Sequence, residues 1–255
     1  MLKKWADNLV VSLFFLTFAD IMTYSVVGMG AIGGYYGGQL AKAGREVHFL
    51  SHSDYEHVLQ HGLQVDSCNG NFYLPHINAY GASQDMPKTD IIVVGLKSVK
   101  NHDVLSELLR PIIHEDSVVV LIQNGIGLED DLQAQFPGLS IVAGLAFICS
   151  AKVGPGHINH QCYGSINLGN YSCPEDKFKA LTDDFADKMI QMTDEMVPYS
   201  PSMKLDYDFH RPMEIYYLYS RPIEEAKKVG FEMPKLAMLE AELKFIETIR
   251  SNPQS

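Results

Sequence analysis

Three glycines with the spacing of a dinucleotide-binding turn follow a short apolar run near the start of the chain. The segment reads Gly28-Met29-Gly30-Ala31-Ile32-Gly33. In such a turn the first glycine permits the tight bend, the second lets the backbone approach a pyrophosphate, and the third allows close helix packing. The following helix N-terminus supplies amide donors. Because an apolar run and a helical stretch flank the motif, we favour a dinucleotide site over a purely structural glycine turn.

The end of the next apolar run, residues 47–50, bears on which dinucleotide fits. An acidic residue at this point would hydrogen-bond the ribose hydroxyls of NAD. Here the run leads into Ser51, His52 and Ser53, whose hydroxyls and imidazole accommodate a 2′-phosphate that a carboxylate would repel. The sequence therefore predicts NADP(H), with His52 as a contact. Two alternatives remain. The Asp54 carboxylate could turn toward the ribose hydroxyls, and His52 could be an ordinary exposed loop histidine.

A lysine and an asparagine follow two later apolar runs. Lys97 comes after residues 91–95, and Asn124 comes after residues 118–122. The carboxyl ends of parallel strands form the edge where doubly wound sheets bind ligands. A solvated lysine and a turn-forming asparagine are the alternatives. The placement favours a ligand contact for both side chains.

Short β-branched runs alternate with helical stretches through the first part of the chain, which is the pattern of βαβ units. We expect strands over residues 25–28, 47–50, 91–95, 118–122 and 141–145, and helices over 32–43, 99–113 and 128–136. The runs are continuously apolar, as in strands covered on both faces. The fold class is therefore α/β, with a Rossmann-type, mostly parallel sheet.

The chain changes character after this sheet. Gly154, Pro155 and Gly156 separate two runs, 147–153 and 158–168, and indicate an antiparallel addition. After Pro174 the composition is helical, with apolar residues at helical spacing over 234–249. We expect a Rossmann domain over residues 22–170 and a shortened all-helical domain over residues 171–255.

The first residues call for a separate interpretation. Lys3 and Lys4 precede an apolar stretch over residues 9–19, which resembles a signal peptide but is too short to span a bilayer. Met22 stands directly before the first strand. We therefore expect residues 1–21 to be an N-terminal extension, with translation starting at Met22.

Composition excludes several classes of partner. The formal charge of −11 disfavours nucleic acid and anionic membranes. The cysteines form no Cys-x-x-Cys pair, so we expect reduced thiols in a cytoplasmic protein. They are Cys68, Cys149, Cys162 and Cys173. His157, His160, Cys162 and Cys173 match no standard zinc spacing, so no metal site is expected.

Five separated motifs together resemble the ketopantoate (2-dehydropantoate) reductases, from Tyr24 to Ile249. The motifs are residues 28–33, Val94-Gly95-Leu96-Lys97-Ser98, Ile122-Gln123-Asn124-Gly125-Ile126-Gly127, Gly154-Pro155-Gly156-His157-Ile158, and Ser202-Met203 followed by Asp206, Arg211-Pro212 and Glu214. Their common order makes the resemblance more specific than any single motif.

The resemblance implies a reaction and a set of site residues. The reaction is NADPH-dependent reduction of ketopantoate, a small 2-keto acid, to pantoate, as in pantothenate and coenzyme A biosynthesis. Lys97 and Asn124 would lie at the nicotinamide end, with Asn124 also reaching the substrate. Ala151 would line the same cleft, and Ser202 would bind the substrate carboxylate. Glu214 would contact cofactor or substrate, which makes Lys97, Asn124 and Glu214 the catalytic candidates.

One family feature is missing. Relatives carry a Lys-Leu-x-x-Asn-x-x-x-Asn helix whose lysine is the expected general acid, whereas only 27 residues separate Pro174 from Ser202 here. Their lysines, Lys177, Lys179 and Lys188, lack the paired asparagines. An internal deletion would expose apolar helix faces, which predicts either partial disorder or burial by a partner. A second copy in a homodimer is the expected macromolecular partner.

Three functional interpretations therefore stay open. In the first, Lys97 or water replaces the acid at reduced efficiency, because general acid catalysis contributes roughly 10²–10⁴-fold. In the second, the chain binds the cofactor without turnover. In the third, it reduces a different 2-keto or 3-keto acid.

Overall fold

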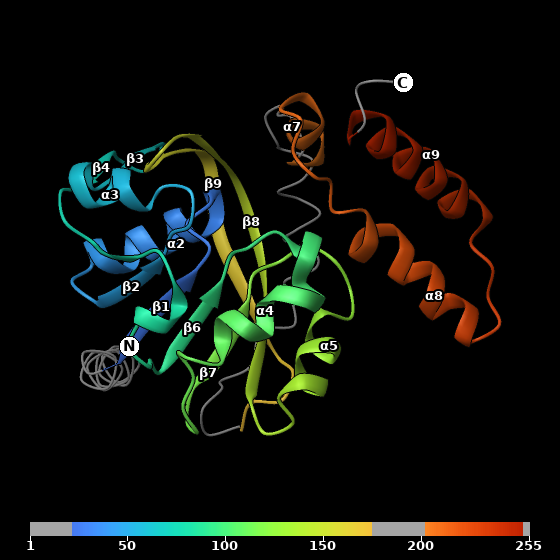
Figure 1. The fold of residues 1–255 in the computed structure, drawn as a ribbon, viewed down its shortest axis with the longest axis horizontal. Coiled ribbons are helices and arrows are strands. Elements are labelled where there is room, and N and C mark those ends of the chain that lie inside the picture. The colour runs from blue at the N-terminus through green and yellow to red at the C-terminus, as the bar shows by residue number, and fades with distance from the viewer. Residues whose placement is uncertain (1–21, 175–201, 252–255) are drawn as a thin grey trace, which may run out of the picture. The chain divides into compact units, whose positions relative to one another are not determined.

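The protein forms a nine-stranded sheet in the order β4-β3-β9-β8-β7-β6-β1-β2-β5 (Figure 1). The computed structural model describes residues 22–174 and 202–251. The strands are β1 Thr23–Val27, β2 Glu46–Leu50, β3 Leu63–Ser67, β4 Phe72–Leu74, β5 Asn78–Tyr80, β6 Ile91–Val94, β7 Val118–Leu121, β8 Ser140–Gly154 and β9 His157–Asn170. The expected extension over residues 1–21 lies outside the described ranges.

Helices connect and follow the strands. They are α2 Ala31–Lys42, α3 Tyr55–His61, α4 Asn101–Leu109, α5 Leu128–Gln135, α7 Ser202–Asp208, α8 Arg221–Lys228 and α9 Pro234–Ser251, with the single-turn 3₁₀ segments η1 Ser83–Asp85 and η2 Ser98–Lys100 and the π-helical η3 Tyr216–Ser220. Within the described part of the chain, no helix combines the length and apolarity needed to cross a bilayer.

Strand pairing is mostly parallel. β1 pairs in parallel with β2 and β6, and β2 pairs in parallel with β5. The first of these registers places Tyr24 opposite Val47. β3 pairs in parallel with β9 and antiparallel with β4. The predicted Rossmann-type sheet is confirmed.

The sequence patterns located the central strands and missed the short elements between β2 and β6. The expected runs at 141–145 and 147–153 belong to one 15-residue strand, β8, because nothing between them breaks the extended backbone. No element was predicted between residues 54 and 90, where α3, β3, β4 and β5 occur. β4 and β5 have three residues each, too few to display a period. The expected helix over 99–113 begins as η2 and ends at Leu109.

Helix α2 packs through glycines instead of large apolar side chains. Gly33, Gly34, Gly37 and Gly38 are all buried on it. A Cβ at Gly37 would lie 2.6 Å from the Phe49 ring, and one at Gly34 would lie 2.9 Å from Ile158. The helix therefore approaches the sheet more closely than a helix with side chains at these positions could.

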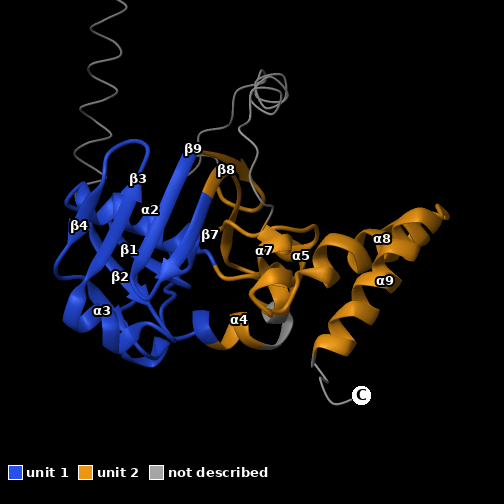
Figure 2. Cartoon of the chain, turned by 90° about the horizontal axis from the view of Figure 1, so that it is seen from above, with its two compact units in different colours: residues 1–95, 108–120, 150–163 blue, residues 96–107, 121–149, 164–255 orange. Residues whose placement is uncertain are grey.

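Packing divides the chain into two compact units, which Figure 2 colours separately. Unit 1 comprises residues 1–95, 108–120 and 150–163 and holds the glycine motif. Unit 2 comprises residues 96–107, 121–149 and 164–255 and holds Lys97, Asn124, Ser202 and Glu214. The units interleave along the sequence, and the expected boundary near residue 170 stays a prediction.

Candidate active site

The glycine motif of unit 1 forms a bare turn before α2. Gly28 has φ +95°, which a side chain would disfavour, and Gly30 is the N-cap of the helix. No side chain caps this N-terminus, and a Cβ on Gly30 would meet nothing within 4 Å. At Gly33 a Cβ would lie 2.1 Å from the Gly28 carbonyl oxygen. The first-turn amides beside open space at Gly30 fit a pyrophosphate.

Met29, Ala31 and Ile32 complete the motif. Met29 is buried, and Ala31 and Ile32 are partly exposed in the first turn of α2. Ser150 of β8 donates a hydrogen bond to the Ala31 carbonyl oxygen over 3.2 Å. Ala151 is the next residue of β8 and is also partly exposed.

The loop after β2 is organised around Asp54. Lys152 of β8 donates to one Asp54 carboxylate oxygen over 2.5 Å, and the Gly156 amide donates to the other over 2.9 Å. Ser53 also donates to Asp54, over 2.8 Å. His52 is exposed, and the buried Ser51 hydroxyl has no hydrogen-bond partner among the described residues.

These contacts determine the charge state of Asp54. Burial alone would raise the pKa of its carboxyl, but the hydrogen bonds from Lys152, Gly156 and Ser53 outweigh it and hold the pKa below the ordinary value of 3.8. Asp54 is thus an ionised group with its own partners.

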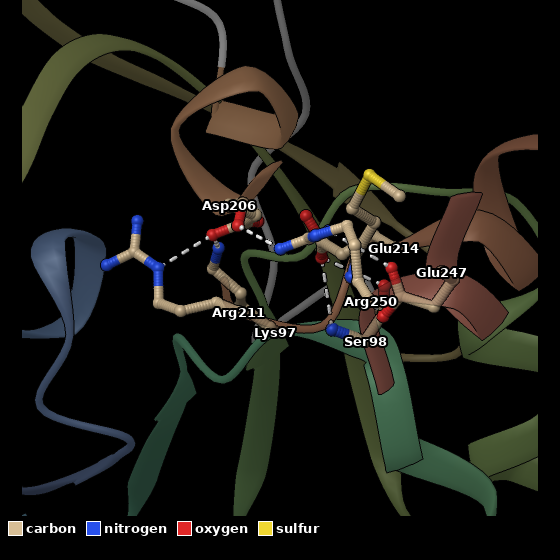
Figure 3. A network of polar contacts seen from close by, with 8 residues as sticks. Lys97, Ser98, Asp206, Arg211, Glu214, Glu247 and Arg250 are labelled. Carbon is tan, nitrogen blue, oxygen red and sulfur yellow. Dashed lines mark hydrogen bonds and ion pairs between the residues drawn. The ribbon is translucent and has the colours of Figure 1, made fainter. Parts of the chain in front are cut away.

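In unit 2, a buried aspartate joins two cations (Figure 3). Lys97, just after β6, donates to Oδ1 of Asp206 on α7, and Arg211 Nε donates to the same oxygen over 3.0 Å. The Asp206 side chain is fully buried, whereas that of Lys97 is 41% exposed. The Lys97 ammonium is therefore fixed by a buried carboxylate, while the rest of its side chain is partly accessible to solvent.

A buried glutamate occupies the neighbouring position. Oε1 of Glu214 accepts a hydrogen bond from the Ser98 amide over 3.1 Å and lies 2.9 Å from the Ser98 hydroxyl (Figure 3). The same hydroxyl lies 3.1 Å from the Asn124 carbonyl oxygen. Ser98 therefore joins Glu214 to the turn that carries the exposed Asn124.

The turn at Asn124 is fixed from two sides. Gln123 donates to the Leu96 carbonyl oxygen over 2.8 Å. Gly125 has φ +126°, and a Cβ there would lie 2.4 Å from the Tyr217 Cβ. The Tyr217 hydroxyl donates to Asp131 of α5 over 2.9 Å. Burial and this hydrogen bond raise the pKa of Tyr217, so it stays a neutral donor.

Ser202 begins α7 and is exposed. Asp206 lies four residues further along the helix, so the two side chains share one face of α7. Lys97 contacts that face through Asp206. The structure thus brings Asn124 and Glu214 together at Ser98, the neighbour of Lys97, and places Ser202 one turn before Asp206 on α7. The predicted residues at 28–33, His52 and Ala151 belong to unit 1.

Several contact residues received no role from the sequence. Asp206 and Arg211 were named only as members of a family motif. The four-residue spacing from Ser202 to Asp206 could have indicated that these two side chains share one helix face. The sequence did not indicate a role for Lys152, because its partner Asp54 lies 98 residues away. Among the described residues, no three His, Cys, Asp or Glu side chains lie close enough to hold a metal ion. His157 instead pairs with Asp66, and His160 lies 2.8 Å from the Ser67 hydroxyl.

Fold and site together define an oxidoreductase of the dinucleotide-binding α/β class. The family model described as ketopantoate reductase PanE/ApbA matches residues 24–172. A 2-dehydropantoate 2-reductase from Nostoc sp. is 34% identical over 88% of this chain and 95% of its own length. The chain belongs to the ketopantoate reductase family.

Solved structures share the fold. The 2-dehydropantoate 2-reductase from Geobacter metallireducens matches with a TM-score of 0.76 and 28% identity, over 88% of this chain and 99% of its own. D-mandelate dehydrogenase in a ternary structure with NADH matches with a TM-score of 0.75 over 90% of this chain and 99% of its own. At 18% identity, the second likeness concerns the fold alone.

The alignment to the Nostoc relative also bears on the missing segment. It extends over 303 residues, whereas 88% of this 255-residue chain is only about 224 residues. The difference, 303 less about 224, leaves roughly 80 aligned positions of the relative without a counterpart here. A deletion of that size agrees with the absent lysine motif.

Alanine at Gly30 and at Gly33 should separate cofactor binding from folding. At Gly30 a methyl group meets open space, so we expect a stability loss of about 1 kcal/mol or less, with the Kd for NADPH rising about tenfold or more as the methyl displaces the pyrophosphate. At Gly33 the methyl meets the Gly28 carbonyl, and overpacking should cost about 1–3 kcal/mol. Urea unfolding and fluorescence titration measure both quantities. Unchanged NADPH affinity in Gly30→Ala would contradict this assignment of the turn.

Asparagine at Asp54 should destabilise the protein in a pH-dependent way. The lowered pKa means that the carboxylate stabilises the fold above pH 3.8 and that this contribution is lost as pH falls through the still lower folded-state pKa. At pH 7 we expect Asp54→Asn to lower the free energy of unfolding by about 1.5–3 kcal/mol. The difference in free energy of unfolding between the native protein and Asp54→Asn should narrow below about pH 4, near the ordinary pKa of an aspartate.

Urea titrations from pH 3 to 7 follow this gap. The exposed Asp85 provides a matched control, and Asp85→Asn should change stability by less than about 0.5 kcal/mol at every pH. A gap for Asp54→Asn that stays constant with pH would show that the ion pair with Lys152 does not stabilise the fold.

Proposed function

We propose that this protein reduces 2-dehydropantoate to pantoate with NADPH. Family membership supports the reaction class. The observation that carries the proposal is the convergence of three distant segments in unit 2. Exposed Lys97 and Asn124 lie beside the buried carboxylates of Asp206 and Glu214, and exposed Ser202 begins the helix that carries Asp206. Such a group of donors suits a small anionic keto acid.

The glycine motif supports binding of the dinucleotide through the pyrophosphate. The uncapped first turn of α2 offers its amides, and nothing within 4 Å of Gly30 obstructs the approach. The nicotinamide, when bound, supplies the hydride. His52 and Ala151 remain proposed contacts in unit 1.

The choice of NADP(H) over NAD(H) rests on the loop after β2. Asp54 is the acidic residue that could have bound the ribose hydroxyls, but Lys152 and the Gly156 amide hold its two oxygens. Lys152 also brings a positive charge within 3.4 Å of the Ser53 hydroxyl. A cation beside Ser53, in the loop that also carries Ser51 and His52, favours a 2′-phosphate.

Unit 2 would perform the substrate chemistry. The Lys97 ammonium can stabilise the oxygen that becomes an alkoxide and donate a proton to it. Ser202 would bind the substrate carboxylate, and Asn124 would orient the carbonyl. Glu214 is hydrogen-bonded to Ser98. We therefore assign Glu214 two roles, which are to hold the Lys97–Ser98 segment in place and to contact cofactor or substrate.

Cell location and assembly belong to the same proposal. The four cysteines, all of them in the described part of the chain, form no disulfide, which suits a reducing compartment, the cytoplasm. Met238, Phe245 and Ile249 of α9 are each at least half exposed, and a second copy in a homodimer would cover this face. The charge of −11 argues against a nucleic-acid partner.

Oxidation of NADPH in the presence of ketopantoate tests the proposal. We expect turnover with NADPH at a higher kcat/KM than with NADH. Ser202→Ala should raise the KM for ketopantoate about tenfold, the equivalent of one charged hydrogen bond, while the KM for NADPH stays unchanged. A panel of 2-keto and 3-keto acids, followed by product identification, serves as the control for substrate.

The outcomes distinguish the three interpretations. NADPH binding without oxidation for every keto acid would make the chain a cofactor-binding module, which the roughly 80 missing positions would explain. Preferred turnover of another keto acid would change the substrate and keep the site. Tighter binding of NADH than of NADPH would overturn the role of the loop at Ser51–Ser53.

A further inference from the structure

Lys97 stands at a position where a lysine would ordinarily be free to move. It follows the end of β6, and its side chain is 41% exposed. An exposed lysine carries a flexible four-carbon stem and samples many rotamers. Here the ammonium instead contacts Asp206, which is 109 residues away in the sequence and fully buried. One end of the contact is therefore immobile.

Asp206 is itself held at several atoms. Its backbone carbonyl oxygen accepts hydrogen bonds from the Arg211 amide over 2.8 Å and from Arg250 Nη2 over 3.2 Å. Its Oδ1 accepts the Arg211 Nε hydrogen bond in addition to the one from Lys97. Figure 3 shows these side chains converging on Asp206. The carboxylate has little freedom to follow a moving lysine.

The arrangement is poorly suited to a purely stabilising role. Both cations use the same oxygen, and the buried Oδ2 has no hydrogen-bond partner among the described residues. A buried ion pair is often no more stabilising than well-packed apolar side chains of similar volume. A buried polar group left partly unsatisfied calls for another explanation.

We propose that Asp206 is a positioning residue, which holds the Lys97 ammonium in one place for the reduction of the keto acid. The inference rests on the proposed function, in which Lys97 acts on the carbonyl oxygen. The Lys97 side chain stays 41% exposed in this arrangement, so a substrate can still reach it. Ser202, the proposed contact for the substrate carboxylate, lies one turn before Asp206 on the same helix, α7.

A double-mutant cycle tests this coupling. Because a misplacement of about 1 Å can cost roughly 10²-fold in rate, we expect Asp206→Asn to lower kcat by about that factor and leave the KM for NADPH unchanged. Lys97→Met should lower kcat at least as much. If Asp206 acts through Lys97, the double variant should be no slower than Lys97→Met alone.

A matched control comes from the same helix. Asp208 is an exposed aspartate of α7 that pairs with Lys204 over 2.6 Å, and Asp208→Asn should keep the native kcat. Two results would each overturn the inference: a native kcat in folded Asp206→Asn, and rate losses that multiply in the double variant, as expected of a merely structural residue.

The ammonium itself gives a readout that requires no turnover and no folded Asp206 variant. Pairing with a buried carboxylate slows exchange of ammonium protons with water, so the native protein labelled with ¹⁵N-lysine should show an NH₃⁺ resonance that Lys97→Met lacks. No such resonance would overturn the inference even if Asp206→Asn fails to fold. Absence of NADPH oxidation by the native protein refutes the proposed function, whereas an active protein insensitive to Asp206→Asn refutes this inference alone.

Discussion

Two buried carboxylates govern the structure of unit 2. Asp206 and Glu214 are 0% and 4% exposed, and a charge so far removed from water is strongly destabilising unless donors surround it. The donors come from consecutive residues at the end of β6, because Lys97 pairs with Asp206 and Ser98 with Glu214. The need to satisfy these carboxylates therefore fixes α7 and the segment after it against Lys97 and Ser98.

The same requirement links the exposed groups of the proposed site to buried residues. Lys97, Asn124 and Ser202 all reach the surface, yet each is attached to a buried partner or to an element that carries one. Asn124 lies on a turn held by Gln123 and Tyr217, next to the π-helical η3, a type of segment often found at functional sites. Preorganised donors above a rigid support are what stabilisation of a developing alkoxide requires.

Sequence patterns were sufficient where the signal was local. The glycine motif and the continuous apolar runs located β1, α2, β2, β6 and β7, because each is determined by neighbouring residues. The three-residue strands β4 and β5 were missed, since three residues carry no period. Partners such as Asp206 for Lys97 and Lys152 for Asp54 are about 100 residues apart. Only the folded chain brings them together, so no spacing rule could have paired them.

Transfer of deuterium from NADPH that carries deuterium at both C4 positions of the nicotinamide tests whether this protein reduces a keto acid by hydride transfer. A reductase that uses this site should deliver the label to C2 of the hydroxy acid, and mass spectrometry of the product would show one extra mass unit at that carbon. An unlabelled product, or labelled cofactor that stays reduced with every keto acid, would contradict the account.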